Sequence, residues 1–294
     1  MVREILEPHS VYAAVMATET GFELGGFKLD RDLDVIRIYR RGAAAKIELN
    51  RPERMNAWNA ELGEKLRDSV QELGADAGVR AVLISGAGRG FSSGADIRDE
   101  NRERTPDGHP DVRKSLTERY HPIITGIRGM PKPVVAAVHG AAAGIGCSLA
   151  LSCDLIVAAE SAYFLLAFVN IGLVPDGGSS LLVPTRVGFA RAAELALLGE
   201  RLPAPAALDW GLINRVVPDD VLAGAAEELT LRLAAGPTRS YAGAKRALNS
   251  WLYGRMEEQL ELEAELQAEM AASADFAEGV AAFAEKRPPR FTGA

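Results

Sequence analysis

The chain has 294 residues, of which 48% are hydrophobic and 25% are charged, and this composition is typical of one large globular domain or two smaller ones. The formal net charge of −7 at pH 7 and the isoelectric point near 5.3 argue against a nucleic-acid or anionic-membrane partner. No apolar run is long enough to span a bilayer, and the first residues show no signal-peptide pattern. The expected location is therefore the cytoplasm.

The N-terminal part of the chain predicts an extension followed by a hairpin, a helix and a strand. Residues 1–31 show weak hydrophobic patterning and are expected to form the extension. Residues 34–50 alternate in hydrophobicity on both sides of Gly42, which predicts a β-hairpin. Residues 56–76 carry apolar side chains at helical spacing, and residues 79–88 read as a strand that is buried on both faces.

The middle of the chain alternates between strands and helices. Residues 96–119 are strongly charged and interrupted by prolines, which favours a loop leading into a helix. The elements predicted after this loop are strand 132–140, helix 143–154, strand 155–161, helix 189–199, helix 206–212 and strand 214–217. Such alternation is typical of the α/β class with parallel strand pairing. The α/β core is expected to span residues 32–225.

Residues 226–294 are predicted to form a separate helical region. Residues 254–274 are Glu-rich and amphipathic. A second helix is expected to follow, because Asp275 and Glu278 have the spacing of a capping box. Two antiparallel helices attached to an α/β core could pack on that core or dock on a neighbouring subunit.

Two segments combine a buried strand, a turn of small residues and a predicted helix start. They are VLISGAGRGFSSGADI, residues 82–97, and VVAAVHGAAAGIGCSLA, residues 134–150. Small residues let the backbone approach a ligand, and a helix start offers unpaired N–H groups. Two such turns can direct one N–H each at a single developing oxyanion. The alternative is that both turns are tight only for packing reasons.

A third segment, FVNIGLVPDGGSS, spans residues 168–180 and has Asp176 as its one ionisable residue. Asp is a favoured cap for a helix that starts near Gly178. Apolar surroundings would instead raise the pKa of the carboxyl toward neutrality, which suits a group that both accepts and donates a proton. From the residues alone both interpretations stay open.

Six segments, taken together in this order, resemble the crotonase, or enoyl-CoA hydratase/isomerase, superfamily. They are LNRPERMNAWN, GRGFSSGADI, GAAAGIGCSLALSCDLIVAAESAYF, IGLVPDGGSS, ALDWGLINRVV and FAEGVAAFAEKRPPRF. The resemblance covers residues 34–291 and implies a spiral of β-β-α units with a C-terminal helical trimerisation region. It also implies an acyl-CoA thioester substrate, and a homotrimer or a hexamer built as a dimer of trimers. No metal or redox cofactor is implied, since coenzyme A enters as part of the substrate.

The resemblance assigns roles to particular residues. The main-chain N–H groups of Ala95 and Ile145 would hold the thioester oxygen as an enolate, and Asp176 would relay a proton, as in double-bond isomerases with an IGLxPDxG segment. The residues expected to contact CoA or the acyl group are Arg54, Met55, Ser93, Gly94, Asp96, Ile97, Gly144, Ser148, Phe168, Pro175, Phe283 and Lys286. Phe283 and Lys286 would reach the CoA of a neighbouring subunit.

The resemblance also favours one activity over another. Two-glutamate hydratases of the superfamily hold water at positions that are Ser148 and Phe168 here, so both carboxylates are missing. The predicted function is therefore an enoyl-CoA isomerase. Two alternatives remain, namely a hydratase in which Asp176 or a loop acid activates water, and a non-catalytic acyl-CoA-binding protein.

Other classes of protein fit the sequence poorly. The segment GCSLA around Ser148 imitates a hydrolase nucleophile elbow, but all four histidines precede it, whereas that family requires its histidine after the serine. Cys147 and Cys153 are expected to be core residues rather than a disulfide. No cysteine–histidine cluster has zinc-site spacing.

Overall fold

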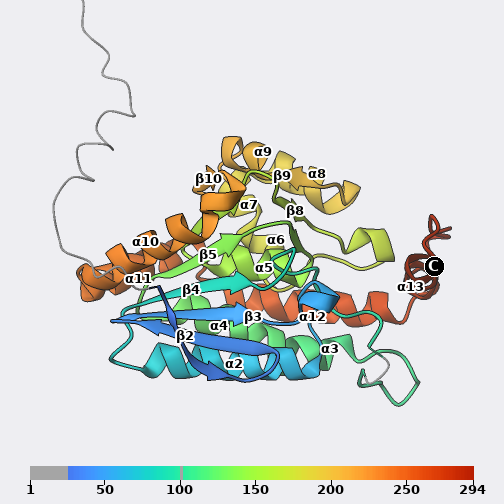
Figure 1. Cartoon of the computed structure of the whole chain (residues 1–294). Coiled ribbons are helices and arrows are strands. Elements are labelled where there is room, and N and C mark those ends of the chain that lie inside the picture. The colour runs from blue at the N-terminus through green and yellow to red at the C-terminus, as the bar shows by residue number, and fades with distance from the viewer. Residues whose placement is uncertain (1–25, 100–101) are drawn as a thin grey trace, which may run out of the picture.

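The first strands form an antiparallel arrangement at one edge of a large sheet (Figure 1). The computed structural model describes residues 26–99 and 102–294. Strand β1 (Lys28–Asp32) pairs antiparallel with β2 (Ile36–Arg41), and β2 pairs antiparallel with β3 (Ala44–Leu49). The predicted hairpin is thus confirmed.

The N-terminal extension was predicted to end at residue 31, but the sheet already begins at Lys28. Strand β1 starts there and pairs with β2. Most of its side chains are exposed, so this edge strand lacks the apolar alternation by which a strand is detected in a sequence. The remainder of the predicted extension, residues 1–25, lies outside the described residues.

The sheet continues with parallel strands. These are β4 (Ala81–Gly86), β5 (Val134–Val138), β7 (Leu155–Ala159) and β10 (Arg215–Val217). The strand order is β1-β2-β3-β4-β5-β7-β10, and each pair from β3 onward is parallel. A second, smaller sheet has the order β6-β8-β9, with bounds Ala141–Ala143, Tyr163–Leu165 and Leu202–Pro203. The α/β class with parallel pairing is therefore confirmed.

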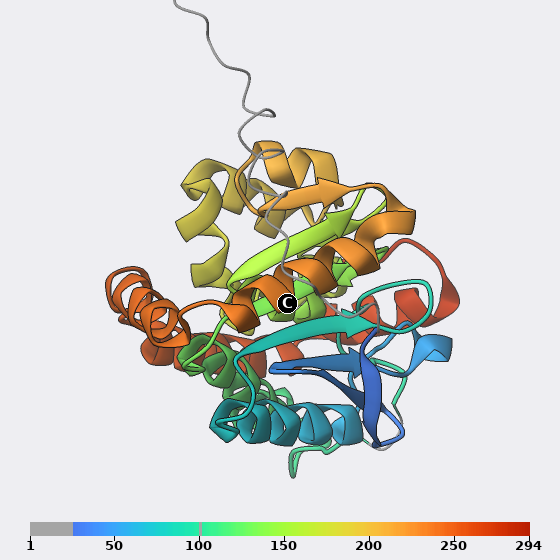
Figure 2. The ribbon, with the colours of Figure 1, turned by 60° about the vertical axis from the view of Figure 1, so that its left-hand side comes forward.

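Helices cover the large sheet (Figure 2). Helix α10 (Leu222–Ala235) packs on β4, β5 and β7, and helix α2 (Ala60–Ala75) packs on β2 and β3. The Asn59 side chain caps α2 by accepting a hydrogen bond from the Leu62 N–H at 2.9 Å. The other helices before α10 are η1 (Pro52–Arg54), α3 (Val112–Ser115), the π-helix η2 (Leu116–Tyr120), α4 (His121–Gly129), α5 (Ile145–Ser152), η3 (Val169–Ile171), α6 (Ser179–Leu182), α7 (Pro184–Val187), α8 (Phe189–Leu198), α9 (Ala204–Asp209) and η4 (Asp219–Val221).

The C-terminal region is helical, as predicted, and it packs on its own core. Helices α11 (Thr238–Leu252), α12 (Met256–Ala271) and α13 (Ala274–Glu285) follow α10. Helix α12 packs on α3 and α6, and α13 packs on η3 (Figure 1). This packing brings two helices from the end of the chain to the segments that the sequence singled out.

The start of α13 differs from the predicted capping box. The cap is Ser273, whose hydroxyl accepts a hydrogen bond from the Phe276 N–H at 3.0 Å. The Asp275 carboxylate instead accepts hydrogen bonds from the N–H groups of Thr292 and Gly293, at 2.6 and 2.8 Å. The capping box predicted from the spacing of Asp275 and Glu278 is therefore wrong, because the C-terminal tail folds back onto the helix start and bonds Asp275.

Three further observations bear on function. Cys147 and Cys153 are buried and unbonded, which confirms them as core residues. Among the described residues, no helix has the length and apolar character needed to cross a bilayer. In the same part of the chain, no three His, Cys, Asp or Glu side chains gather as metal ligands would.

Candidate active site

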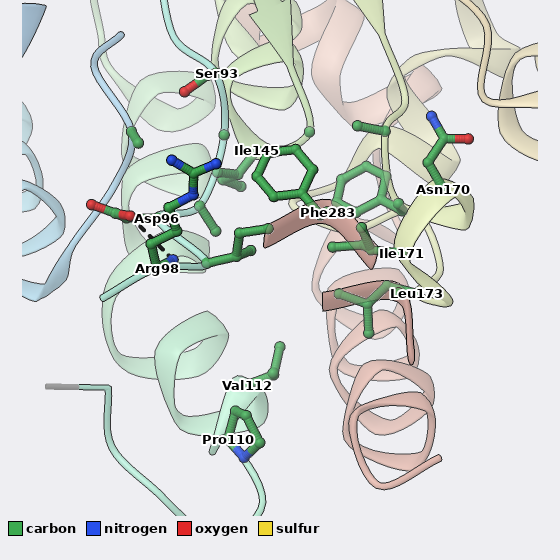
Figure 3. Close-up of a pocket in the computed structure, with 18 of the residues that line it drawn as sticks. Ser93, Asp96, Arg98, Pro110, Val112, Ile145, Asn170, Ile171, Leu173 and Phe283 are labelled. Atoms are coloured by element: carbon green, nitrogen blue, oxygen red, sulfur yellow. Dashed lines mark hydrogen bonds between the residues drawn. The ribbon is translucent and has the colours of Figure 1, made fainter. Parts of the chain in front are cut away.

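A cavity of about 570 Å³ opens between the loop after β4, the start of α5, the segment before α6 and helix α13 (Figure 3). Most of the predicted site residues line it, namely Arg54, Met55, Ser93, Gly94, Ala95, Asp96, Ile97, Gly144, Ile145, Phe168, Asp176 and Phe283. The predicted residues outside its lining are Ser148, Pro175 and Lys286. The fold thus gathers residues that are far apart in the sequence, while their contact with a substrate stays a prediction.

A β-bridge joins the two small-residue turns. The Ser92 N–H donates to the Ala141 oxygen, and the Ala143 N–H donates to the Ser92 oxygen, each at 2.9 Å. Gly94 has a φ of +96°, and a Cβ placed on it would lie 2.9 Å from the Ala143 oxygen. Glycine is therefore required there by both conformation and space. The bridge holds the two turns in direct contact.

Each turn leaves one main-chain N–H unpaired at the cavity wall. The Trp58 N–H donates to the Gly94 oxygen at 2.8 Å, and the Asp96 N–H donates to the Trp58 oxygen at 2.9 Å. Because successive peptide groups in an extended segment point to opposite sides, the Ala95 N–H points away from Trp58. Ile145 is the first residue of α5, where N–H groups lack an intrahelical acceptor. Within the described chain neither N–H has a hydrogen-bond partner.

The first turn differs from its prediction, since no helix starts there. The next described helix is α3, which begins at Val112. The turn is held by Asn56 instead, whose buried side-chain amide donates to the oxygens of Ala87 and Gly90 at 2.9 and 2.8 Å. The Ala95 N–H is therefore left unpaired by the strand-like geometry of this segment rather than by a helix terminus.

Asp176 lines the same cavity and is only 6% exposed. Its Oδ2 accepts a hydrogen bond from Gln267 Nε2 at 2.7 Å, whereas Oδ1 has no partner among the described residues. Burial raises the pKa of this carboxyl well above its usual value, the nearby charge of Glu263 raises it further, and the Gln267 bond lowers it. A Cβ placed on Gly177 would lie 2.4 Å from Ile145 Cδ1, so Asp176 is next to a residue that packs on the second turn.

The alternative interpretation of Asp176 as a helix cap is wrong. Helix α6 follows Gly178 and has no side-chain cap from the residues before it. The carboxylate at this helix start is that of Glu263, which accepts hydrogen bonds from the N–H groups of Gly178 and Ser180 at 2.7 and 3.1 Å. The Asp176 side chain is therefore left available to the cavity.

The two positions of the hydratase glutamates carry a hydroxyl and a ring. Ser148 is fully buried, and its Oγ donates to the main-chain oxygen of Asp176 at 2.8 Å. Phe168 lines the cavity, and its ring would lie 3.9 Å from a Cβ placed on Gly144. Ser148 therefore supports the Asp176 backbone, while Phe168 covers the second turn with an apolar surface.

The part of the cavity lining next to the first turn is polar and carries two arginines and one glutamate. These are Arg54, Arg89 and Glu53, which line the cavity together with Met55 and Ser93. The Ser93 N–H donates to the Met55 oxygen at 2.9 Å, which ties the residues around the first turn to the segment before α2. Arginine in this part of the lining suits phosphate groups, so the predicted CoA contacts of these residues are compatible with their placement.

The remaining predicted residues have varied surroundings. Asp96 is paired with Arg51, whose Nη1 lies 3.1 Å from its Oδ2, and this pair supports the first turn. Phe283 lines the cavity of its own chain, while Lys286 is exposed at the end of α13 and Pro175 is half-buried. Their predicted reach into a neighbouring subunit stays a prediction.

Apolar side chains form much of the remaining wall. Figure 3 shows Phe283, Ile171 and Leu173 on one side of the cavity, and Arg98 and Val112 on other sides. The elements that carry them are η3 with the segment after it, helix α13, and the loop and helix that follow the first turn. The cavity therefore combines a polar part next to the first turn with an apolar interior.

Tyr120 was missed by the sequence analysis. It lines the cavity, and its ring packs edge-on against Trp58 with centroids 5.1 Å apart. Burial raises the pKa of its phenol, and the charge of Asp176 raises it further. Tyr120 ends the π-helical turn η2, a type of turn that is frequent at functional sites. A π-helical turn has no sequence signature, so nothing in the chain pointed to this residue.

Comparison with known proteins shows the family to which the chain is similar. A family model described as enoyl-CoA hydratase/isomerase matches residues 40–294. The 1,2-epoxyphenylacetyl-CoA isomerase of Escherichia coli K12 is 43% identical over 247 residues, which cover 84% of this chain and 94% of the relative. The trans-2-decenoyl-acyl-carrier-protein isomerase of Streptococcus mutans is 34% identical over 249 residues, covering 85% and 94%.

Solved structures agree with these relatives. The chain is similar to the enoyl-CoA hydratase from Mycobacterium avium subsp. paratuberculosis K-10, with a TM-score of 0.80, 37% identity, and coverage of 88% of this chain and 98% of that one. It is also similar to the enoyl-CoA hydratase/isomerase from Pseudoalteromonas atlantica T6c, with a TM-score of 0.78, 36% identity, and coverage of 88% and 100%. The predicted fold is confirmed, and the similar proteins carry the names of both activities.

Proposed function

Because the chain belongs to the enoyl-CoA hydratase/isomerase, or crotonase, superfamily, it is an enzyme of that family, and we propose that it is an enoyl-CoA isomerase with Asp176 as its proton relay. In the proposed reaction the thioester oxygen accepts hydrogen bonds from the N–H groups of Ala95 and Ile145. Both donors are unpaired within the described chain, and both belong to residues that line the cavity. They would stabilise the negative charge that the oxygen gains when an α-proton leaves.

Asp176 would move the proton. Its free Oδ1 takes a proton from C2 of a 3-enoyl thioester, and the electron pair spreads over the dienolate to the thioester oxygen. The same carboxyl then returns a proton to C4, which gives the 2-enoyl product. No electrons enter or leave the substrate, so the step calls for no redox partner. A buried carboxyl with a raised pKa suits both halves of this transfer.

One observation carries the choice of isomerase over hydratase. The two positions that hold water-binding glutamates in hydratases are a hydroxyl bonded to backbone, Ser148, and an aromatic ring, Phe168. A water molecule near Asp176 would therefore lack the second carboxylate that splits it. Hydration of a 2-enoyl-CoA is the second candidate, because a structure named enoyl-CoA hydratase is 37% identical to this chain.

The test compares the wild type with Asp176→Asn on 3-enoyl-CoA and 2-enoyl-CoA thioesters. We expect the wild type to shift the double bond of the 3-enoyl substrate and the variant to lose at least 10³-fold in kcat, as expected when the only proton carrier is removed. Asp219→Asn is the matched control, since Asp219 is exposed and lies outside the cavity lining.

Three outcomes would contradict the proposal. Undiminished turnover by Asp176→Asn would remove the proton relay. Water addition without bond migration would identify a hydratase. A wild type that binds acyl-CoA without exchanging its α-protons with deuterated solvent would identify a non-catalytic binding protein.

We further propose that the chain forms a homotrimer or a dimer of trimers through residues 226–294. Exposed apolar side chains on α11 and α12 support this, among them Trp251, which is 87% exposed, Leu248 and Leu262. Light scattering should give the molar mass of three or six chains, and Trp251→Glu should lower it. A monomeric wild type would contradict the proposal.

A further inference from the structure

Helix α12 presents a polar stripe to the segment that carries Asp176. Gln259, Glu263 and Gln267 are spaced by four residues and so lie on one face of the helix. Glu263 is 2% exposed and Gln267 is fully buried. Long polar side chains are rarely buried in this way unless their polar atoms are bonded.

Each member of the stripe bonds the segment from residue 174 to residue 180. Gln259 Nε2 donates to Ser180 Oγ at 2.8 Å. The Glu263 carboxylate accepts hydrogen bonds from two main-chain N–H groups near the start of α6 and from Ser180 Oγ. Gln267 Nε2 donates both to the Val174 oxygen at 2.8 Å and to an oxygen of Asp176 at 2.7 Å. Helix α12 thus holds both the backbone and the carboxylate of the predicted proton relay.

The hydrogen bonds on Asp176 are asymmetric. Gln267 occupies Oδ2, while Oδ1 has no partner among the described residues. Its main-chain oxygen accepts hydrogen bonds from Ser148 Oγ at 2.8 Å and from the Ser179 N–H at 3.1 Å. The backbone and one carboxylate oxygen of Asp176 are thus fixed by hydrogen bonds, which restricts the position of the other oxygen.

The charges around Asp176 come from two neighbouring elements. Burial raises the pKa of Glu263 on α12, and its three hydrogen-bond donors oppose that shift by favouring the ionised form. When Glu263 is ionised, its negative charge raises the pKa of Asp176. Tyr120 on η2 faces Asp176 as a neutral phenol, because burial raises its own pKa. Gln267 is uncharged, and its N–H favours the ionised carboxylate. Glu263 and Gln267 therefore act on Asp176 in opposite directions.

We propose that Gln267 and Glu263 are positioning residues for the proposed reaction, in which Gln267 fixes one oxygen of Asp176 so that the other faces the substrate, and Glu263 sets the charge state of that carboxyl. Neither residue lines the cavity, so neither needs to touch the acyl-CoA. The inference rests on the proposed function of Asp176 and adds α12 to the catalytic apparatus.

The test uses Gln267→Met, Glu263→Gln and the control Gln259→Met in the full chain. Gln267→Met keeps the length of the side chain and removes the N–H donor, so kcat on a 3-enoyl-CoA should fall about tenfold, as expected for one hydrogen bond to a charged group, with KM little changed. The acid limb of the kcat–pH profile of this variant should move to higher pH, because the Gln267 hydrogen bond lowers the pKa of Asp176. In Glu263→Gln the limb should move to lower pH, because a negative neighbour is gone.

Gln259→Met is the matched control because Gln259 lies on the same stripe and bonds Ser180 but not Asp176. Its pH profile should match that of the wild type even if its melting temperature falls. Shifts in the same direction for Gln267→Met and Glu263→Gln, unshifted profiles, or equal shifts in the control would overturn the proposal. Melting temperatures of all the variants identify any loss that reflects unfolding.

A second measurement separates this inference from the proposed function. Infrared difference spectra between each protein and the same protein with Asp176→Asn report the protonation of this carboxyl without any turnover. Opposite shifts of that titration in the two variants would support the role of α12 even if Asp176 proved not to be the base. An unmoved titration would overturn it, whatever the activities are.

Discussion

The cavity has two halves that are built in different ways. The half proposed to hold the oxyanion, called the oxyanion half, consists of main-chain N–H groups at two turns joined by the bridge between Ser92 and Ala142. The half proposed to transfer the proton, called the proton-transfer half, depends on side chains, since the Asp176 carboxylate is held by Gln267 from a helix 91 residues later in the chain. The first half depends on backbone geometry that only glycine permits at Gly94, whereas the second depends on long-range packing of α12.

This difference indicates how each half fails. A main-chain donor is lost only through substitution by proline, which has no N–H, so other substitutions damage the oxyanion half only by moving the backbone. The proton-transfer half can be altered one atom at a time, because each of its contacts comes from a separate side chain. Substitutions in the two halves should therefore have separable effects on kcat, pH dependence and stability.

The largest effect is expected from Gly94→Ala, which disrupts the oxyanion half. In Gly94→Ala the new methyl would meet the Ala143 oxygen at 2.9 Å, and the residue would have to keep a φ of +96°. The two turns should move apart, and kcat should fall by about 10²–10³-fold, the usual cost of losing an oxyanion donor. Steady-state kinetics on a 3-enoyl-CoA measures this.

Gly42→Ala is the control for this prediction. Gly42 also has a positive φ, +54°, but a Cβ there meets nothing within 4 Å, and it lies in the turn between β2 and β3. It should lower the melting temperature slightly and leave kcat unchanged. A Gly94→Ala variant with kcat within about threefold of the wild type would show that the turns need not stay in contact.

The next prediction concerns the stability of the proton-transfer half. Above the usual Asp pKa of 3.8 an unfolded chain releases the Asp176 proton, while the folded chain keeps it because its pKa is raised. The folded state then binds more protons, so stability falls as pH rises from about 3.8 until the raised folded pKa is passed. Asn has no proton to lose and can still accept the Gln267 bond.

Asp176→Asn should therefore be more stable than the wild type at neutral pH, by about 1–3 kcal/mol, the usual cost of burying a polar group without all its partners. The gain should shrink toward zero near pH 3.5, below the usual Asp value of 3.8. Denaturant unfolding at several pH values measures it. A variant less stable than the wild type at neutral pH would show that burial of the charge carries no cost here.

A smaller effect is expected at the junction of the two halves. Ser148 lies on α5, whose first residue is the proposed oxyanion donor Ile145, and the Ser148 hydroxyl donates to the main-chain oxygen of Asp176. Ser148→Ala should cost about 1 kcal/mol of stability and lower kcat by roughly threefold to tenfold through a looser Asp176. Ser152→Ala is the matched control, because Ser152 is also buried on α5 and donates only to Leu149 of its own helix. Equal kcat values for the two variants would contradict the prediction.

The sequence predicted the oxyanion half better than the proton-transfer half. The turns at Gly94 and Gly144 are local, so a run of small residues after a buried strand was enough to predict both turns. The N–H groups of Ala95 and Ile145 were assigned by the resemblance to the superfamily. The role of Asn56 was missed, because it holds the first turn from 31 residues before Ala87 and no local pattern records that contact. Asp176 itself was found, but its two interpretations could be separated only by seeing where its carboxylate points.

The partners of Asp176 could not be predicted for a physical reason. Glu263 and Gln267 lie in a Glu-rich helix whose polar residues look like an ordinary solvated face. Only the packing of α12 against α6 turns that face inward. The predicted capping box at Asp275 was wrong for a similar reason, because the C-terminal tail, 17 residues later, occupies its carboxylate.

The smallest expected effect concerns a contact between two side chains of the cavity lining, Arg98 and Phe283. The Arg98 guanidinium lies 5.4 Å from the centroid of the Phe283 ring, which links the loop after the first turn to α13. Such a contact at an exposed site contributes about 0.5–1 kcal/mol, so Arg98→Gln and Phe283→Leu should each raise KM by roughly twofold to fivefold while kcat stays the same. Arg191→Gln is the control, because Arg191 makes a similar contact with Trp210 outside the cavity lining.

The double variant with both substitutions shows whether Arg98 and Phe283 act through their mutual contact. If they act through the cation–π contact, the KM of the double variant should equal that of either single variant. Multiplied effects on KM would instead mean that Arg98 and Phe283 contact the substrate independently of each other.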